Sequence, residues 1–210
     1  MRRLRLGIDV DGVLADWDFK ARELLRREFG MLLNESRHWD DIERQIGPLK
    51  WTWLWEEGIK KGLFLSPPQY PENVRELKDA AKRHDIVLIT KVPWEAREDR
   101  LHWLKEKEIP FKQLEMLDKG SNKGDIKCDA YLDDYEVNVE EIAKKQIQAH
   151  VCLLDRPWNR KVSLTTFNTF RVHSLAEFIR FIESIEKGEE KLRDSDFRDD
   201  DTIPSWEMAY

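Results

Sequence analysis

The stretch LRLGIDVDG, residues 4–12, passes from apolar side chains into two aspartates and a glycine. Its apolar part predicts a buried strand, and the Asp-Gly pair predicts a turn where that strand ends. Asp9 and Asp11 are two residues apart, so in an extended chain their side chains lie on the same side. We therefore expect a strand that brings two carboxylates to its carboxyl end.

The chain beyond this stretch alternates short apolar runs with stretches of helical periodicity. We expect four further strands, at residues 86–89, 114–117, 130–132 and 150–154. We expect helices at 18–29, from 71 onward, at 95–108, at 137–147 and from 174 onward. Apolar strands that alternate with amphipathic helices are typical of a parallel sheet covered on both faces. The sequence therefore predicts an α/β fold.

The segment between the first two predicted strands departs from this alternation. Residues 31–70 have weak periodicity, a Pro-Pro pair and many aromatic side chains. We interpret residues 17–70 as a small, mostly helical cap, inserted into a core formed by residues 1–16 and 71–187. Residues 188–210 contain eight acidic and three basic side chains, and we expect this tail to be mobile.

Composition and charge exclude several classes of protein. The 210 residues are 37% charged and 40% hydrophobic, which is typical of a globular chain. No apolar run approaches the roughly 18 residues of a membrane span. The net charge of −6 leaves no general basic surface for duplex nucleic acid. Cys128 and Cys152 lack the spacing of a zinc site or a disulfide scaffold, so we expect a reduced, cytoplasmic protein.

Polar side chains follow three of the predicted strands where those strands end. They are Asp9 with Asp11, Thr90, and Asp133 with Asp134. Ligands of such sheets bind outside the carboxyl ends of the strands. Four carboxylates at one edge would repel each other unless a cation lies among them. Oxygen ligands without a suitable His or Cys favour a hard ion, Mg²⁺ first.

Lys123 and Thr90 add a cation and a hydroxyl to the predicted site, with Lys119 and Lys127 as local alternatives to Lys123. Together with a metal they could bind a dianionic phosphate group. An aspartate beside such a phosphate can attack phosphorus, and a carboxyl two residues later can act as general acid and base. Each feature alone has an ordinary structural explanation, such as a turn at Asp-Gly. Their conjunction at one sheet edge favours phosphate chemistry.

Four motifs of the chain resemble those of the haloacid dehalogenase superfamily of phosphotransferases. They are IDVDGVLAD at 8–16, VLIT at 87–90, Lys123, and YLDD at 131–134. Within the superfamily the chain resembles the 5′(3′)-deoxyribonucleotidases, the cytosolic type C 5′-nucleotidases, including bacterial and phage members. The closer resemblance rests on Trp17 after the first motif, Asp129 between the last two, LDRPWNR at 154–160, and RVHS at 171–174. It covers roughly residues 4–186.

The resemblance implies a Rossmann-like core, a small helical cap between the first two motifs, and roles for the motif residues. Asp9 would be the nucleophile and Asp11 the general acid and base. Thr90 and Lys123 would hold the phosphate group. The implied ligands of Mg²⁺ are Asp9, the backbone carbonyl of Asp11, Asp134, and Asp133 either directly or through water.

The resemblance also implies an aromatic side chain against the base of the substrate, which here is Trp17. Further candidates from the cap are Trp39, Trp53 and Trp55, and packing of the cap on the core is the alternative role for these side chains. Trp51, Trp53 and Trp55 alternate along the chain, as on a strand or on one side of an irregular loop.

Two features of the sequence have no assigned role. Lys91 follows Thr90 where vertebrate members of the family have a serine. Its ammonium either adds a second cation to the phosphate site or points to solvent. The run from Arg156 to Arg160 either contacts substrate or forms a loop stabilised by the packing of Trp158.

We therefore expect a Mg²⁺-dependent phosphomonoesterase that acts on nucleoside 5′-monophosphates, with deoxyribonucleotides preferred. A sugar or small-metabolite phosphatase of the same superfamily is the alternative. A non-catalytic nucleotide-binding protein is less favoured, because both Asp9 and Asp11 are present. The sequence leaves open the base and sugar preference, the use of 3′-phosphates, and the oligomeric state, a homodimer included.

Overall fold

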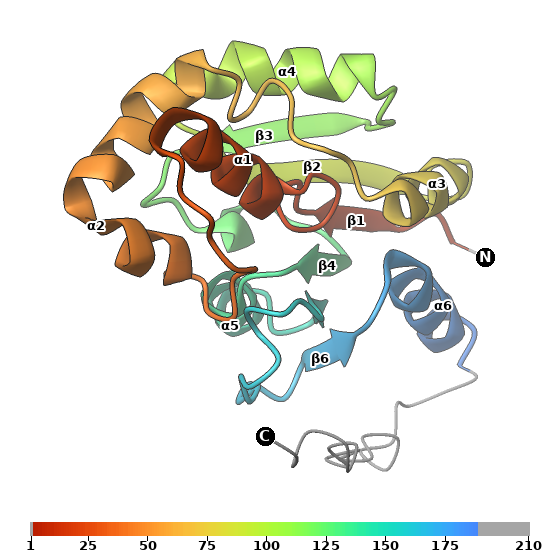
Figure 1. Ribbon diagram of the computed structural model, residues 1–210. Helices are drawn as coiled ribbons and strands as arrows, with labels where there is room; N and C mark the ends of the chain where they lie inside the picture. The colour runs from red at the N-terminus through yellow and green to blue at the C-terminus, as the bar shows by residue number, and fades with distance from the viewer. Residues whose placement is uncertain (1, 189–210) are drawn as a thin grey trace, which may run out of the picture.

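The computed structural model describes residues 2–188, so the acidic tail from residue 189 lies outside the described residues. Its centre is a six-stranded sheet in the order β3-β2-β1-β4-β5-β6, with every pair parallel (Figure 1). The strands are β1 (Arg5–Ile8), β2 (Asp85–Lys91), β3 (Gln113–Leu117), β4 (Ala130–Asp133), β5 (His150–Leu154) and β6 (Thr169–Val172). The sequence predicted the first five. It missed β6, which has four residues, of which only Val172 is buried.

Helices cover both faces of this sheet. The first face packs against α3 (Pro71–Ala80), α4 (Arg97–Glu106) and α6 (Leu175–Glu186), and the other against α5 (Glu136–Lys145). In β1, Leu6 and Ile8 face the first layer and Gly7 faces the second. A Cβ at Gly7 would lie 2.7 Å from the ring of Tyr131, so this position needs glycine. The predicted α/β fold is confirmed.

The segment between β1 and α3 is mostly helical. It contains α1 (Trp17–Phe29), α2 (Asp41–Trp53), which is kinked at Gly47, and a π-helical turn at Leu54–Gly58. Their apolar side chains form a cluster that also takes in Val92 and Ala96, which follow β2. The alternating tryptophans from residue 51 to 55 are therefore helical, and both predicted conformations, a strand and an irregular loop, are wrong.

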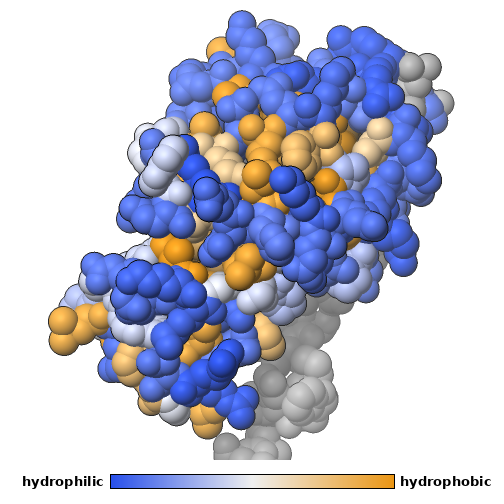
Figure 2. Space-filling model, turned by 90° about the horizontal axis from the view of Figure 1, so that it is seen from above, coloured by the Kyte–Doolittle hydropathy of each residue, from blue (hydrophilic) through white to orange (hydrophobic). Residues whose placement is uncertain are grey.

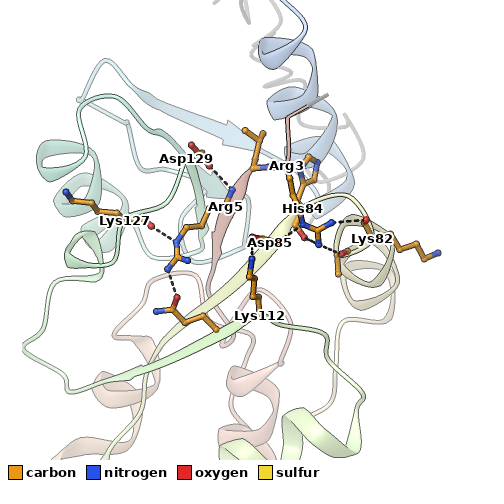
Figure 3. Close-up of polar contacts among 11 residues, drawn as sticks. Arg3, Arg5, Lys82, His84, Asp85, Lys112, Lys127 and Asp129 are labelled. Atoms are coloured by element: carbon orange, nitrogen blue, oxygen red, sulfur yellow. Dashed lines mark hydrogen bonds and ion pairs between the residues drawn. The ribbon is translucent and has the colours of Figure 1, made fainter.

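Ion pairs and hydrogen bonds join the starts of the central strands (Figure 3). Asp85, the first residue of β2, pairs with Arg3 and with Lys112. The backbone N–H of Arg5, the first residue of β1, donates to the carboxylate of Asp129 at 2.7 Å. Charged side chains therefore connect the strands at the amino edge of the sheet. The candidate site described next lies at the opposite, carboxyl edge.

The face of the molecule seen from above is mostly hydrophilic (Figure 2). Figure 2 shows the molecule from above, the side on which α4 lies in Figure 1, with hydrophobic side chains gathered near the middle of a hydrophilic face. Within residues 2–188, no helix has both the length and the apolar character needed to cross a membrane.

Candidate active site

The carboxyl edge of the sheet brings together side chains from segments far apart in the sequence. Asp9 follows β1, and its backbone N–H still donates to the carbonyl of Leu132 in β4, at 3.0 Å. Asp133 ends β4 and Asp134 follows it. One oxygen from each of these three carboxylates lies within 4.8 Å of the others, and all three residues are buried. The structure thus gathers three of the predicted site residues in one place.

Lys123 is the cation of this cluster. Its Nζ lies 2.8 Å from Asp9 Oδ2 and 2.6 Å from Asp133 Oδ2. The residue is almost fully buried, at the start of a single 3₁₀ turn whose preceding Asn122 accepts a hydrogen bond from the N–H of Gly124. One of the local alternatives to Lys123, Lys127, lies at the opposite edge of the sheet. Its backbone carbonyl accepts a hydrogen bond from Arg5 Nε there (Figure 3).

Burial dominates the electrostatics of the cluster. It raises the pKa of Asp9 to about 7; Lys123 opposes this shift and Asp133 adds to it. Burial, followed by the charges of Asp9 and Asp133, also raises the pKa of Asp134. Burial lowers the pKa of Lys123, but the two neighbouring carboxylates outweigh this and raise it. The site therefore holds more negative charge than one ammonium balances, and it favours a proton or a second cation.

The environment of Asp134 fits a divalent metal ion. Its Oδ1 is buried and has no hydrogen-bond partner among residues 2–188. Gly12, with φ +76°, passes so close that a Cβ there would lie 2.0 Å from Asp134 Oδ2. A set of carboxylate oxygens without His or Cys suits a hard cation such as Mg²⁺. Asp9, Asp133 and Asp134 could hold such an ion, and the carbonyl of Asp11 remains a predicted ligand.

Asp11 has a partner that the sequence did not suggest. Its carboxylate forms an ion pair with Arg100, a fully buried residue of α4. The guanidinium of Arg100 also lies 5.2 Å from the ring centre of Phe64 and 5.3 Å from that of Trp103. Burial raises the pKa of Asp11, and Arg100 opposes that shift. Arg100 gave no signal in the sequence, because α4 is highly charged and resembles an exposed helix.

The predicted phosphate-binding residues lie at the end of β2. Thr90 is fully buried, and its Oγ1 has no hydrogen-bond partner in the described part of the chain. Lys91 Nζ donates to Asn138 Oδ1 at 2.8 Å, and Asn138 Nδ2 donates to Asp133 Oδ1 at 3.1 Å. Lys91 is therefore held against α5 rather than extended into solvent. Its contact with a phosphate group stays a prediction.

Two of the tryptophans predicted for the base pocket contact each other. Trp17 stacks on Trp55 with ring centres 5.6 Å apart. The Nε1 of Trp17 is buried without a hydrogen-bond partner within residues 2–188. Trp53 instead packs edge-on against Phe29, at the end of α1, with ring centres 4.8 Å apart. Trp17 and Trp55 therefore form one aromatic pair at the start of α1. Trp53 forms a separate pair with Phe29 at the end of that helix.

Trp39 lies beside the acidic cluster. Its ring stacks on Tyr135, the residue after Asp134, with centres 4.5 Å apart, and it meets the ring of Trp158 edge to face, with centres 6.3 Å apart. One face of Trp39 is thus occupied by the protein itself. About half of its surface remains exposed.

The loop after β5 packs directly on the cluster. Trp158 is buried, and its Nε1 donates to Asp134 Oδ2 at 2.9 Å. Asn159 Nδ2 donates to the carbonyl of Asp134 at 2.8 Å. Arg156 Nε donates to the carbonyl of Gly12 at 2.6 Å. The packing interpretation of residues 156–160 therefore agrees with the structure, and the loop also makes polar contacts that the sequence did not reveal.

Comparison with known proteins identifies the family. The family model described as 5′ nucleotidase, deoxy (pyrimidine), cytosolic type C protein matches residues 2–187. The chain belongs to this family. The chain is also similar to the protein named "Putative nucleotidase BH1399" of Halalkalibacterium halodurans. The two are 23% identical over 181 residues, which cover 84% of this chain and 91% of that protein. The predicted resemblance is thus confirmed, and the chain is a hydrolase of the haloacid dehalogenase superfamily.

Solved structures show the same fold at low sequence identity. A haloacid dehalogenase-like hydrolase from Streptococcus pneumoniae, SP0104, aligns with a TM-score of 0.63 and 12% identity, covering 86% of this chain and 98% of that one. The L-2-haloacid dehalogenase of Xanthobacter autotrophicus aligns with a TM-score of 0.57 and 10% identity, covering 88% of this chain and 100% of that one. These structural similarities show that this nucleotidase family member has a haloacid dehalogenase-like fold.

Proposed function

We propose that this family member is a Mg²⁺-dependent phosphomonoesterase that hydrolyses nucleoside 5′-monophosphates, deoxyribonucleotides above all, through an aspartyl-phosphate on Asp9. The observation that carries the proposal is the buried cluster of Asp9, Asp133 and Asp134, with Lys123 Nζ 2.8 Å from Asp9. The family description, which names a cytosolic deoxynucleotidase, supports the choice of substrate and a cytoplasmic location.

The side chains at this edge could divide the reaction between them. Lys123 and the hydroxyl of Thr90, which has no hydrogen-bond partner among residues 2–188, would bind oxygens of the phosphate group. An ion held by Asp9, the carbonyl of Asp11, Asp134 and Asp133, the last directly or through water, would offset the charge of the phosphate and its transition state.

Two half-reactions follow from this arrangement. In the first, a carboxylate oxygen of Asp9 attacks phosphorus and the bond from phosphorus to the nucleoside oxygen breaks. Asp11 gives its proton to the departing oxygen. In the second, Asp11 takes a proton from water as the water oxygen attacks phosphorus, and inorganic phosphate leaves Asp9 as a free carboxylate. Arg100, paired with Asp11, would hold this acid and base in position.

A phosphate-release screen tests the proposal. Purified protein with Mg²⁺ is given ribo- and deoxyribonucleoside 5′- and 3′-monophosphates and a panel of sugar phosphates, with Asp9→Asn as the blank. We expect the largest kcat/KM for deoxyribonucleoside 5′-monophosphates and no release by Asp9→Asn. Faster release from sugar phosphates would favour the alternative phosphatase, and no release from any nucleotide would refute the proposal.

A further inference from the structure

The carboxylate of Asp134 has two oxygens in different environments. Oδ2 accepts the indole N–H of Trp158 at 2.9 Å, whereas Oδ1 is buried without a hydrogen-bond partner among residues 2–188. We propose that Trp158 is a positioning residue for the metal: its N–H holds Oδ2 and thereby presents Oδ1 to the divalent ion. Nothing in the sequence pattern LDRPWNR assigns this role.

The loop that carries Trp158 is itself anchored at several points. Asn159 Nδ2 donates to the backbone carbonyls of Asp134 and Leu154, both at 2.8 Å. Arg171 of β6 donates to Asn159 Oδ1 at 2.8 Å and to the carbonyl of Val162 at 2.8 Å. The indole is therefore held by a network that also fixes the main chain of its acceptor. Such outer hydrogen bonds orient metal ligands and select the atom that binds.

An aromatic contact lies next to this hydrogen bond. The rings of Trp39 and Trp158 meet edge to face, and Trp39 stacks on Tyr135, the neighbour of Asp134. Trp158 itself is only 6% exposed. A hydrogen bond to a carboxylate is stronger where water is excluded. Packing of Trp39 on Trp158 would therefore help to hold the indole against Asp134.

The inference rests on the proposed function only for the presence of a metal at Asp134. Without the indole N–H, the carboxylate would lose the hydrogen bond that holds Oδ2, and either oxygen could turn toward the ion. Removal of an outer-shell partner lowers metal affinity by about ten- to a hundredfold. The expected effect is therefore on metal binding in the absence of any substrate.

Calorimetric titration of metal-free protein with MgCl₂ tests the inference. Trp158→Phe keeps an aromatic ring and removes the N–H, and its Kd for Mg²⁺ should rise about ten- to a hundredfold. The control is Trp94→Phe, because Trp94 is exposed and its ring contacts Arg97 rather than any residue of the acidic cluster. The control should bind Mg²⁺ as tightly as the wild type.

A spectroscopic measurement on the wild type covers the case in which Trp158→Phe does not fold. The indole N–H resonance of Trp158, assigned from its through-space contacts, should shift on addition of Mg²⁺, and that of the exposed Trp94 should not. Equal affinities of Trp158→Phe and wild type, or an unmoved Trp158 resonance in metal-saturated protein, would overturn the positioning role.

The two proposals fail in different ways. A wild type that binds no Mg²⁺ would overturn the role of Trp158 together with the metal dependence. A wild type that binds Mg²⁺ tightly but hydrolyses no nucleotide would contradict the proposed function alone, and the titrations of the variants would still decide the role of Trp158.

Discussion

The guanidinium of Arg100, fully buried on α4, forms an ion pair with the carboxylate of Asp11, 89 residues earlier in the chain. Aromatic rings of Phe64 and Trp103 flank the cation. A buried charge without its partner is costly, typically about 3–5 kcal/mol when one member of such a pair is removed. The pair therefore links stability to the position of the proposed acid and base.

Arg100→Met should lower the free energy of unfolding by a few kcal/mol and reduce kcat at least tenfold, because Asp11 loses the group that holds it. Urea unfolding and steady-state phosphate release measure the two effects. Arg97→Met is the matched control, since Arg97 lies one turn earlier and pairs with the exposed Asp118. Its unfolding free energy should change by less than about 1 kcal/mol. Equal losses in both variants would contradict the prediction.

Lys123→Met should destabilise the metal-free protein, because three buried carboxylates would lose the only ammonium that contacts Asp9 within the described chain. The expected loss is about 3–5 kcal/mol, the usual effect of breaking a buried pair. Addition of Mg²⁺ should restore part of it by balancing the same charge. Urea unfolding with EDTA or with Mg²⁺ measures both changes. Lys127→Met, at the other edge of the sheet, should change neither value appreciably.

Asp9→Asn should alter how the stability of the metal-free protein depends on pH. The pKa of Asp9 is raised from 3.8 to about 7 in the folded protein, so its protonated form is favoured by folding. That contribution is fully present below the unfolded pKa and is lost as pH rises through about 7.

The wild type in EDTA should therefore lose more stability between pH 5 and pH 8 than Asp9→Asn does, by up to a few kcal/mol. Urea unfolding at the two pH values measures the difference. Identical pH dependence in the two proteins would show that Asp9 keeps an ordinary pKa.

Trp17→Ala should lower kcat/KM for deoxynucleoside monophosphates if the base stacks on the pair that Trp17 forms with Trp55. Loss of one base–aromatic stack is typically worth about 1–3 kcal/mol, or roughly 5- to 150-fold. Trp53→Ala is the control, since Trp53 packs on Phe29 instead. A sugar phosphate, which has no aromatic ring to stack, should be hydrolysed equally by wild type and Trp17→Ala. Full turnover of nucleotides by Trp17→Ala would favour the sugar phosphatase alternative.

The strand ends were the part of the site that the sequence could predict. Asp9, Thr90 and Asp133 each follow an apolar run, and parallel strands place such residues at one edge. Arg100 and Trp158 could not be predicted in this way, because their partners lie 89 and 24 residues away and neither helical nor strand periodicity encodes such pairs.

The elements without strong periodicity were the least predictable. β6 is a short edge strand with one buried residue, so it has no continuous apolar run. The tryptophans at 51, 53 and 55 alternate like a strand but lie on helical turns, because they pack within the apolar cluster of the segment between β1 and α3. Tertiary packing decided both cases.

A side chain at position 12 would need space that the Asp134 carboxylate fills, since a Cβ on Gly12 would lie 2.0 Å from Asp134 Oδ2. The side chain allowed at one position therefore depends on the residue at the other, although more than a hundred residues of chain separate them. Transfer of the turn at residues 9–12 to another protein would therefore also require an aspartate at the position that corresponds to Asp134. Divergence at either position should likewise be accompanied by change at the other.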